Sequence, residues 1–199
     1  MESPTVQKPA GVSKKHAGSL EDLLENGLLE IYDAEKQILK ALPLMAKSCY
    51  NEDLEDAFNN HLVETRKHIE RLEKIFRRLN IPIQEKQAGC EAMAGLVSEA
   101  AHIIENYPEN HVRDAAIIIS AQKIEHYEIA CYGSLCELSD VLGYWNICDL
   151  LGRTLDDEER TDVELTGIAA RINDNAYEMS HHGYESGENN YRNKKGRAL

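Results

Sequence analysis

Four stretches of the sequence each place a glutamate among regularly spaced apolar residues. Successive residues of an α-helix are rotated by about 100°, so each side chain can be placed relative to the apolar stripe of its helix. A glutamate on the buried face of a helix is costly unless another group neutralises its charge. The glutamates that fall at the centre or on the flank of such stripes are Glu35, Glu64, Glu125 and Glu158.

The second of these stretches also carries two histidines at positions of the core type. His61 and His68 lie one helical turn on either side of Thr65. Glu64 follows His61 by three residues and precedes His68 by four, so these three side chains share one flank of the inner face. Both imidazoles are therefore candidate ligands beside Glu64.

The last two stretches each offer a second carboxylate near the central one. Glu125 is central, and Glu128, three residues later, lies toward one edge from which it can bend inward. Glu158 is also central, and Asp162, one turn later, is just off centre. Glu159 points well to one side and is a poorer candidate by geometry.

A single buried glutamate is best explained by a core salt bridge, but four together are not. Lysine and arginine fall mainly off the stripes, so the core offers few cations to pair with the carboxylates. Two divalent ions would offset about four carboxylate charges, and glutamate with histidine is a ligand set for iron or manganese. We therefore predict a carboxylate-bridged site for about two iron or manganese ions per chain. Ordinary helix packing is the favoured interpretation of Tyr132, although Tyr127 and Tyr132 could each donate a hydrogen bond to a ligand.

The elements that must position these residues are five helices, predicted at about residues 19–48, 52–80, 89–106, 111–142 and 146–172. Ser19 and Asp22 resemble a capping box, and Pro43 is expected to kink or shorten the first helix. Short links predict two antiparallel hairpins, and a connection of about 30 residues permits a crossover that carries the short third helix. No alternation of apolar and polar residues with a period of two persists, so no β-sheet is predicted. The prediction is an all-α, ferritin-like four-helix bundle.

The 199 residues are expected to form one bundle domain over residues 19–174. The polar segment 1–18 is predicted to be a flexible leader, and the segment 175–199, rich in Asn, Gly, Glu and Tyr, a disordered tail.

The net charge of −13 disfavours nucleic acid and anionic membranes as partners. The five cysteines contain no C-x-x-C pair and resemble small core side chains, which indicates a reducing compartment. No signal peptide is visible, and no apolar run approaches the length of about 20 residues that a membrane span needs. These features predict a cytoplasmic protein.

Four strings of the sequence closely resemble the YciE/YciF family of ferritin-like proteins, over about residues 20–170. They occur in the order YDAEKQ, HLVET, QKIEHYEIACYG and LDDEERTDVELT. The resemblance implies a rubrerythrin-like bundle with a dinuclear metal site, a homodimer, and a role in bacterial stress responses. The family name does not itself supply a reaction.

The resemblance also implies a ligand pattern, which this chain follows in part. Glu35 matches the first-helix ligand, and Glu125-x-x-Glu128 resembles the rubrerythrin variant of the third-helix motif. The usual Glu-x-x-His of the second helix is broken, because Lys67 stands three residues after Glu64. His61 or His68 would have to substitute.

On the last helix the same pattern leaves a choice. Glu159-x-x-Asp162 fits it by spacing, whereas Glu158 fits by helix face. We favour Glu158 and keep Asp162 as a second candidate ligand.

Two functions from different classes remain open. A di-iron or di-manganese site of this kind is typical of an oxidoreductase acting on peroxide or dioxygen. The alternative is a non-catalytic stress or structural protein with a vestigial metal site, which the broken Glu-x-x-His motifs favour.

Overall fold

A computed structural model describes residues 18–83 and 89–195, with the backbone alone over residues 182–195. The regular elements of this part of the chain are all α-helices, which confirms the predicted fold class and the five predicted segments. They are α1 (Leu20–Lys47), α2 (Glu52–Leu79), α3 (Glu91–Asn106), α4 (His111–Val141) and α5 (Trp145–Lys195).

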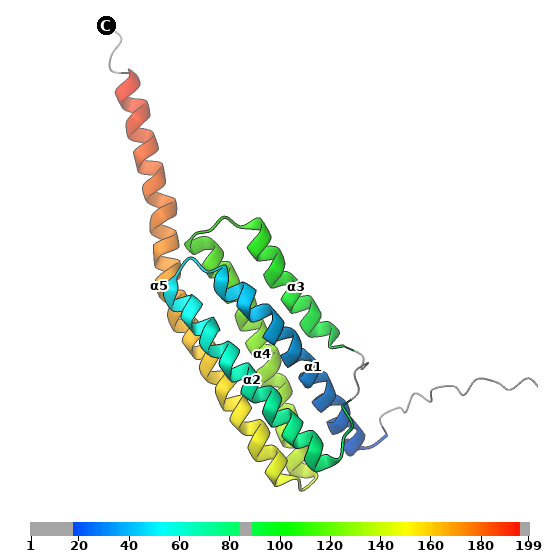
Figure 1. The fold of residues 1–199 in the computed structure, drawn as a ribbon. Coiled ribbons are helices and arrows are strands. Elements are labelled where there is room, and N and C mark those ends of the chain that lie inside the picture. The colour runs from blue at the N-terminus through cyan, green and yellow to red at the C-terminus, as the bar shows by residue number, and fades with distance from the viewer. Residues whose placement is uncertain (1–17, 84–88, 196–199) are drawn as a thin grey trace, which may run out of the picture.

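The helices form a four-helix bundle with one extra helix on its outside (Figure 1). α1 and α2 make one antiparallel hairpin, and α4 and α5 make the other. α2 packs against α5 and α1 packs against α4, so the two hairpins close a ring around one core. α3 lies in the crossover between the hairpins and packs against α1 and α4. The arrangement is the predicted ferritin-like topology.

Side chains at the helix ends explain where several helices begin and end. The Ser19 hydroxyl accepts a hydrogen bond from the Asp22 backbone N–H at 3.1 Å, which confirms the predicted N-cap of α1. α2 ends at Asn80, which has a left-handed backbone with φ of 55°. Gly143, with φ of 76°, makes the turn between α4 and α5, where a side chain would be strained.

A buried carboxylate ties the α1–α2 turn to α4. Asp114, which is fully buried, accepts hydrogen bonds from the backbone N–H groups of Tyr50 and Asn51 at 2.8 and 2.9 Å. These bonds satisfy two amides at the turn and fix its position against the start of α4. The hairpins therefore meet in a defined register, and the inward-facing side chains of all four bundle helices are held at fixed depths.

The core is one contiguous apolar cluster to which every helix contributes buried side chains, those of α3 being Met93 and Ala100. Within the described ranges no helix combines the length and the apolar composition that crossing a membrane requires.

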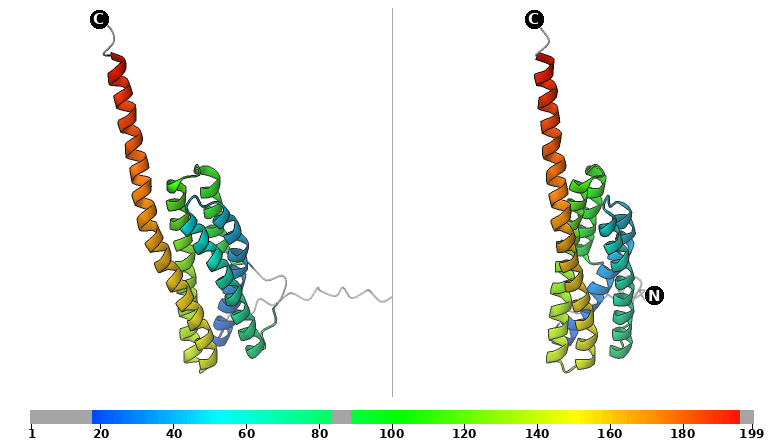
Figure 2. Two further views of the ribbon diagram at one scale, coloured as in Figure 1. Left: turned by 60° about the vertical axis from the view of Figure 1, so that its left-hand side comes forward. Right: turned by 90° about the vertical axis from the view of Figure 1, so that its left-hand side faces the viewer.

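Pro43 does not shorten α1, whose bounds agree with the predicted 19–48, whereas α5 is much longer than predicted. α1 continues for one further turn after Pro43, which has no N–H and therefore makes no intrahelical bond to the Leu39 carbonyl. α5 does not stop near residue 172 but is helical as far as Lys195 and extends beyond the bundle (Figure 2). The predicted disordered tail at 175–199 is thus helical where it is described. Of the predicted leader at 1–18, all but residue 18 lies outside the described residues.

A disulfide joins Cys136 of α4 to Cys148 of α5, whereas the sequence indicated small core side chains and a reducing compartment. The turn at Gly143 folds α5 back on α4 and brings the two Cα atoms to 4.4 Å. This proximity arises from the hairpin, and a spacing of 12 residues in the sequence carries no recognised motif. Cys49, Cys90 and Cys131 are free.

Reduction of this disulfide is expected to lower the free energy of unfolding by about 3 kcal/mol, because the bond closes a short loop in the unfolded chain. Urea unfolding with and without dithiothreitol measures the effect. The loss should persist in Cys49→Ser, which leaves the bond intact, and should vanish in Cys136→Ser. An equal response to reductant in both variants would show that the bond does not stabilise the hairpin.

Candidate metal centre

Six of the predicted ligand residues meet in the middle of the bundle. α1 supplies one, α2 and α4 supply two each, and α5 supplies one, so all four bundle helices contribute. Every one of the six is at most 2% exposed. They are Glu35, His61, His68, Glu125, Glu128 and Glu158.

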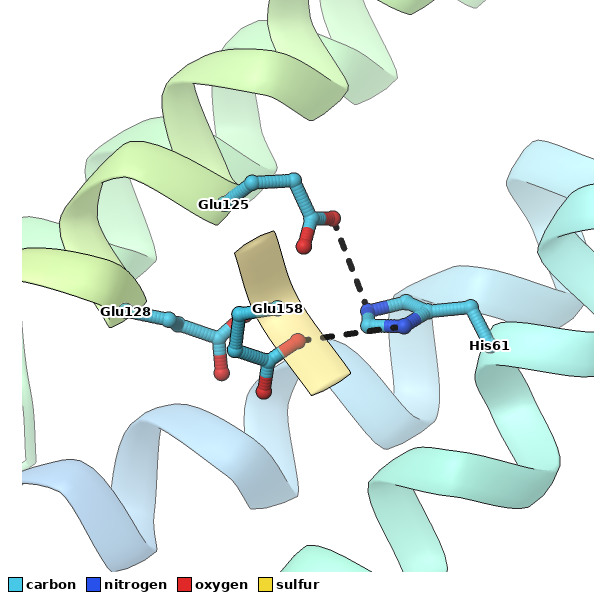
Figure 3. Close-up of side chains that lie close together, drawn as sticks. All are labelled: His61, Glu125, Glu128 and Glu158. Carbon is cyan, nitrogen blue, oxygen red and sulfur yellow. Dashed lines mark ion pairs between the residues drawn. The ribbon is translucent and has the colours of Figure 1, made fainter. Parts of the chain in front are cut away.

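The first group consists of His61, Glu125, Glu128 and Glu158 (Figure 3). One nitrogen or oxygen atom from each lies within 4.8 Å of those of the other three. His61 Nε2 is 3.5 Å from Glu125 Oε1, and His61 Nδ1 is 4.0 Å from Glu158 Oε2. Three carboxylates and one imidazole thus converge on a single point.

The second group consists of Glu35, His68 and Glu158, again with donor atoms within 4.8 Å of one another. His68 Nδ1 is 2.9 Å from Glu158 Oε1 and 3.4 Å from Glu35 Oε1. Glu158 belongs to both groups, and its two oxygens face different histidines. A carboxylate in this position can bridge two cations.

The donor atoms of these residues are largely without hydrogen-bond partners. Among the described residues, ten of the twelve side-chain nitrogen and oxygen atoms of the six are buried and accept or donate no hydrogen bond. Both oxygens of Glu128 and of Glu158 are among them, and the only close contact of Glu158 Oε1 with a cationic group among the described residues is His68 Nδ1 at 2.9 Å. Buried polar atoms are normally paired, and unpaired ones at this density indicate a missing partner. Carboxylate oxygens and imidazole nitrogens are the donors that iron and manganese take, so these residues fit a divalent metal pair.

Burial and mutual repulsion both oppose the simultaneous ionisation of the carboxylates, and the pKa values reflect this. Burial raises the pKa of Glu125 and of Glu128 well above the ordinary glutamate value, and the neighbouring Glu158 and Glu35 raise both further. Burial likewise raises the pKa of Glu158 to about 7, although the contact with His68 opposes the rise. Divalent cations would remove this repulsion and lower all three pKa values.

The two histidines are held in opposite protonation states. Burial, together with the charge of the nearby His68, lowers the pKa of His61 to about 3, so His61 stays neutral. Burial also opposes the charged form of His68, but contacts with Glu158 and Glu35 outweigh it and raise the pKa of His68 to about 10. A neutral imidazole such as that of His61 is the form that binds a metal.

Residues 19–178 match a protein family described as a domain of unknown function, DUF892. The chain belongs to the DUF892 family. A curated relative, protein YciF of Escherichia coli strain K12, is 45% identical over 152 residues. The match covers 76% of this chain and 90% of that protein.

Two solved structures share the fold of this DUF892 chain. The crystal structure of the E. coli stress protein YciF matches with a TM-score of 0.75 and 42% identity, covering 79% of this chain and 98% of that one. YcfI of Rhodopseudomonas palustris, for which a structural role has been put forward, matches with a TM-score of 0.73 and 39% identity. That match covers 77% of this chain and 96% of YcfI.

Two predicted ligands of this DUF892 chain lie outside both groups. Glu64 is a quarter exposed and is bound by Arg160 at 2.7 Å, because it stands on the edge of α2 that faces α5. Asp162 accepts a hydrogen bond from Gln122 at 3.1 Å and lies 3.5 Å from His126. It points from α5 toward α4, one turn past the centre. Neither carboxylate reaches either of the two groups.

Two residues beside these groups make contacts that the sequence did not predict. Tyr132 is fully buried, and its hydroxyl donates a hydrogen bond to Glu35 Oε1, where the sequence analysis favoured plain packing. Asp157, which the sequence analysis did not single out, places Oδ2 at 3.4 Å from His68 Nε2. The signal that could have found Asp157 is its place beside Glu158, on the edge of α5 that faces α2.

Proposed function

We propose that this chain is a bacterial stress-response protein that holds a pair of iron or manganese ions and reduces peroxide or dioxygen. The observation that carries the proposal is the sharing of Glu158 between two converging groups of unpartnered, fully buried donors. Such an arrangement is costly for stability, and cation binding would compensate for it.

Each residue of the centre has a distinct task under this proposal. His61, Glu125 and Glu128 would hold one ion, Glu35 and His68 the other, and Glu158 would contact both. The two metal ions would supply the electrons that reduce the substrate. Burial keeps bulk water away from the centre, which strengthens every charge interaction within it.

Two further side chains fix the ligands in place. Tyr132 holds its proton on Oη against Glu35 Oε1, so Glu35 Oε2 is left to bind a cation. Asp157 Oδ2 lies 3.4 Å from His68 Nε2 without a hydrogen bond between them, and its negative charge favours a proton on Nε2, which leaves Nδ1 for the metal. Arg71 and Arg160 contact the Asp157 carboxylate at 2.7 and 2.8 Å and lower its pKa, so it remains an acceptor.

Protein loaded with iron or manganese is expected to consume hydrogen peroxide, and Glu35→Ala and Glu125→Ala are each expected to abolish this. Glu64→Ala is the matched control, because Glu64 is on α2 but outside both groups, and it should retain the activity. Peroxide consumption by the three variants under identical loading is the measurement. No consumption with either metal would contradict the proposed reaction.

Asp157→Asn is expected to weaken metal binding by about 10- to 100-fold, because His68 loses the nearby negative charge that favours a proton on Nε2 and leaves Nδ1 for the metal. The neighbouring Asp156 is exposed, so Asp156→Asn changes the same charge without touching the centre. Competition with a metal chelator measures both affinities. Equal metal affinities in the two variants would contradict a role of Asp157 in metal binding.

A structural role without catalysis is the second candidate. The structural role put forward for YcfI favours it, as do the contacts by which Tyr132 and His68 partly neutralise Glu35 and Glu158 within the protein. In that case protein purified without chelators would contain no stoichiometric metal, and the Glu35→Ala and Glu125→Ala variants would be as functional in cells as the unaltered chain.

We also propose that the protein is a cytoplasmic homodimer. The resemblance to the YciE/YciF proteins supports both points. Sedimentation of the full chain tests the oligomeric state, and a single species with the mass of one chain would contradict it.

A further inference from the structure

Basic side chains gather in a groove between α2 and α5, on a protein whose net charge is −13. The groove has a volume of about 550 Å³, within the range of small-molecule sites. Five cations and two carboxylates line it, with Leu150 as the apolar floor. The cations are Lys67, Arg71, Lys74, Arg77 and Arg153.

The spacing of these cations forms a continuous row along α2. Lys67, Arg71, Lys74 and Arg77 recur every three or four residues and therefore share one face of the helix. From Lys67 to Arg77 the helix rises by about 15 Å. The row thus presents several positive charges over a length that exceeds one carboxylate or one phosphate.

Most of this charge is not neutralised within the protein. Among the described residues, Lys67, Lys74 and Arg77 form no ion pair, and all three are exposed. Glu73, one of the two acidic residues in the groove, accepts a hydrogen bond from Tyr32 on α1.

Stabilisation of the helix dipole explains only part of the row, because that effect is confined to the last turn of a helix. Arg77 lies in the last turn of α2, but Lys67, Arg71 and Lys74 lie earlier. A solvated helix face would be expected to mix both signs of charge, whereas residues 66–78 contain six basic and two acidic residues.

We propose that the α2–α5 groove binds a nucleotide that carries two or more phosphates. Adjacent phosphates supply several negative charges along one molecule, which matches the row, and arginine binds phosphate through two parallel hydrogen bonds. Leu150 is only 7% exposed, so the apolar surface for a ring comes mainly from the methylene stems of the lysines. The groove does not depend on the metal centre, so it can be tested on the metal-free protein.

Arg71 links the groove to the centre. Its guanidinium lines the groove and also donates hydrogen bonds to Thr154 Oγ1 at 3.1 Å and Asp157 Oδ2 at 2.7 Å. Asp157 in turn contacts His68. A phosphate that draws Arg71 away from Asp157 would therefore change the surroundings of His68 indirectly, because Asp157 contacts both residues.

Isothermal titration calorimetry of the full-length, metal-free chain with ADP at physiological salt tests the proposal. We expect saturable binding at one site, weakened by at least about tenfold in the double variant Lys74→Glu, Arg77→Glu. Both positions are exposed, and circular dichroism checks that the variant is folded. The double variant Lys40→Glu, Lys47→Glu makes the same charge change on exposed positions of α1 and should bind ADP as the unaltered chain does.

Three results would overturn the proposal. They are the absence of saturable binding of ADP, an equal loss of affinity in the α1 control, and binding of a single-stranded oligonucleotide without binding of ADP. Pyrophosphate serves as a further probe, and binding weaker than that of ADP would support a contribution of the nucleoside to recognition.

Discussion

Replacing Glu158 with alanine is expected to reduce the metal content of the protein from about two ions per chain to nearly none. Glu158 is the only residue among those described that belongs to both converging groups, so its loss leaves each group one carboxylate short. The measurement is elemental analysis of protein purified without chelators or affinity-metal columns.

Two other variants make this prediction specific. Glu125→Ala alters only the group that contains His61, and it should leave about one ion per chain in the other group. Glu159 is exposed and adjacent to Glu158, so Glu159→Ala should retain the full metal content. Equal metal contents in the Glu158 and Glu159 variants would contradict the assignment of Glu158 as the shared ligand.

The metal-free protein is expected to lose stability as the pH rises from about 4.5, and metal loading should reverse this trend. Burial raises the pKa of Glu158 from 4.5 to about 7 and raises those of Glu125 and Glu128 in the same direction. Between the ordinary and the raised pKa the folded chain binds more protons than the unfolded chain. Stability therefore falls with rising pH in this window.

The histidines modify this dependence in opposite directions. Carboxylate contacts raise the pKa of His68 from 6.5 to about 10 in the folded chain despite burial, so its contribution is present below pH 6.5 and lost as the pH rises through about 10. Burial lowers the pKa of His61 to about 3, so its effect is a loss of stability as the pH falls below 6.5. Three glutamates and His68 outweigh His61, and the net slope above pH 6.5 is downward.

Urea unfolding at pH 5.5, 7.0 and 8.5, with and without manganese, measures this dependence. One unit of pKa shift corresponds to about 1.4 kcal/mol, so the metal-free protein should change by several kcal/mol over the range. Glu128→Gln should flatten the slope, and Glu64→Gln, at a partly exposed position, should not. A metal-free protein that becomes more stable toward pH 8.5 would contradict the pKa assignments.

The helices and most ligands could be predicted from the sequence because both depend on one periodicity. The apolar stripes determine which face of each helix is buried, and Glu35, Glu125 and Glu158 lie at the centre of that face. Their burial is confirmed, as is that of the two histidines. Two short links and one long crossover were enough to indicate the topology.

The predicted residues that do not join the converging groups lie at the edges of the stripes, where rotation alone does not decide the direction of a side chain. Glu64 and Asp162 each lie within reach of the centre by angle but are drawn away by Arg160 and by Gln122. These partners come from other helices, so their positions are not contained in the pattern of one helix. Asp157 was missed for the same reason, since its role depends on the approach of His68.

Two other features depend on tertiary structure or on weak local signals. The Cys136–Cys148 bond requires the tight turn at Gly143, and cysteine spacing does not reveal it. The extension of α5 to Lys195 passes through a segment with no apolar stripe, where the composition is typical of disorder.

Diffraction from crystals of the iron- or manganese-loaded protein, recorded at the absorption edge of the metal, tests the central claim most directly. The account predicts two anomalous peaks inside the bundle. One should be in contact with His61, Glu125 and Glu128, the other with Glu35 and His68, and Glu158 should contact both. Peaks confined to the protein surface, or the absence of any peak between the four helices, would contradict a dinuclear metal centre.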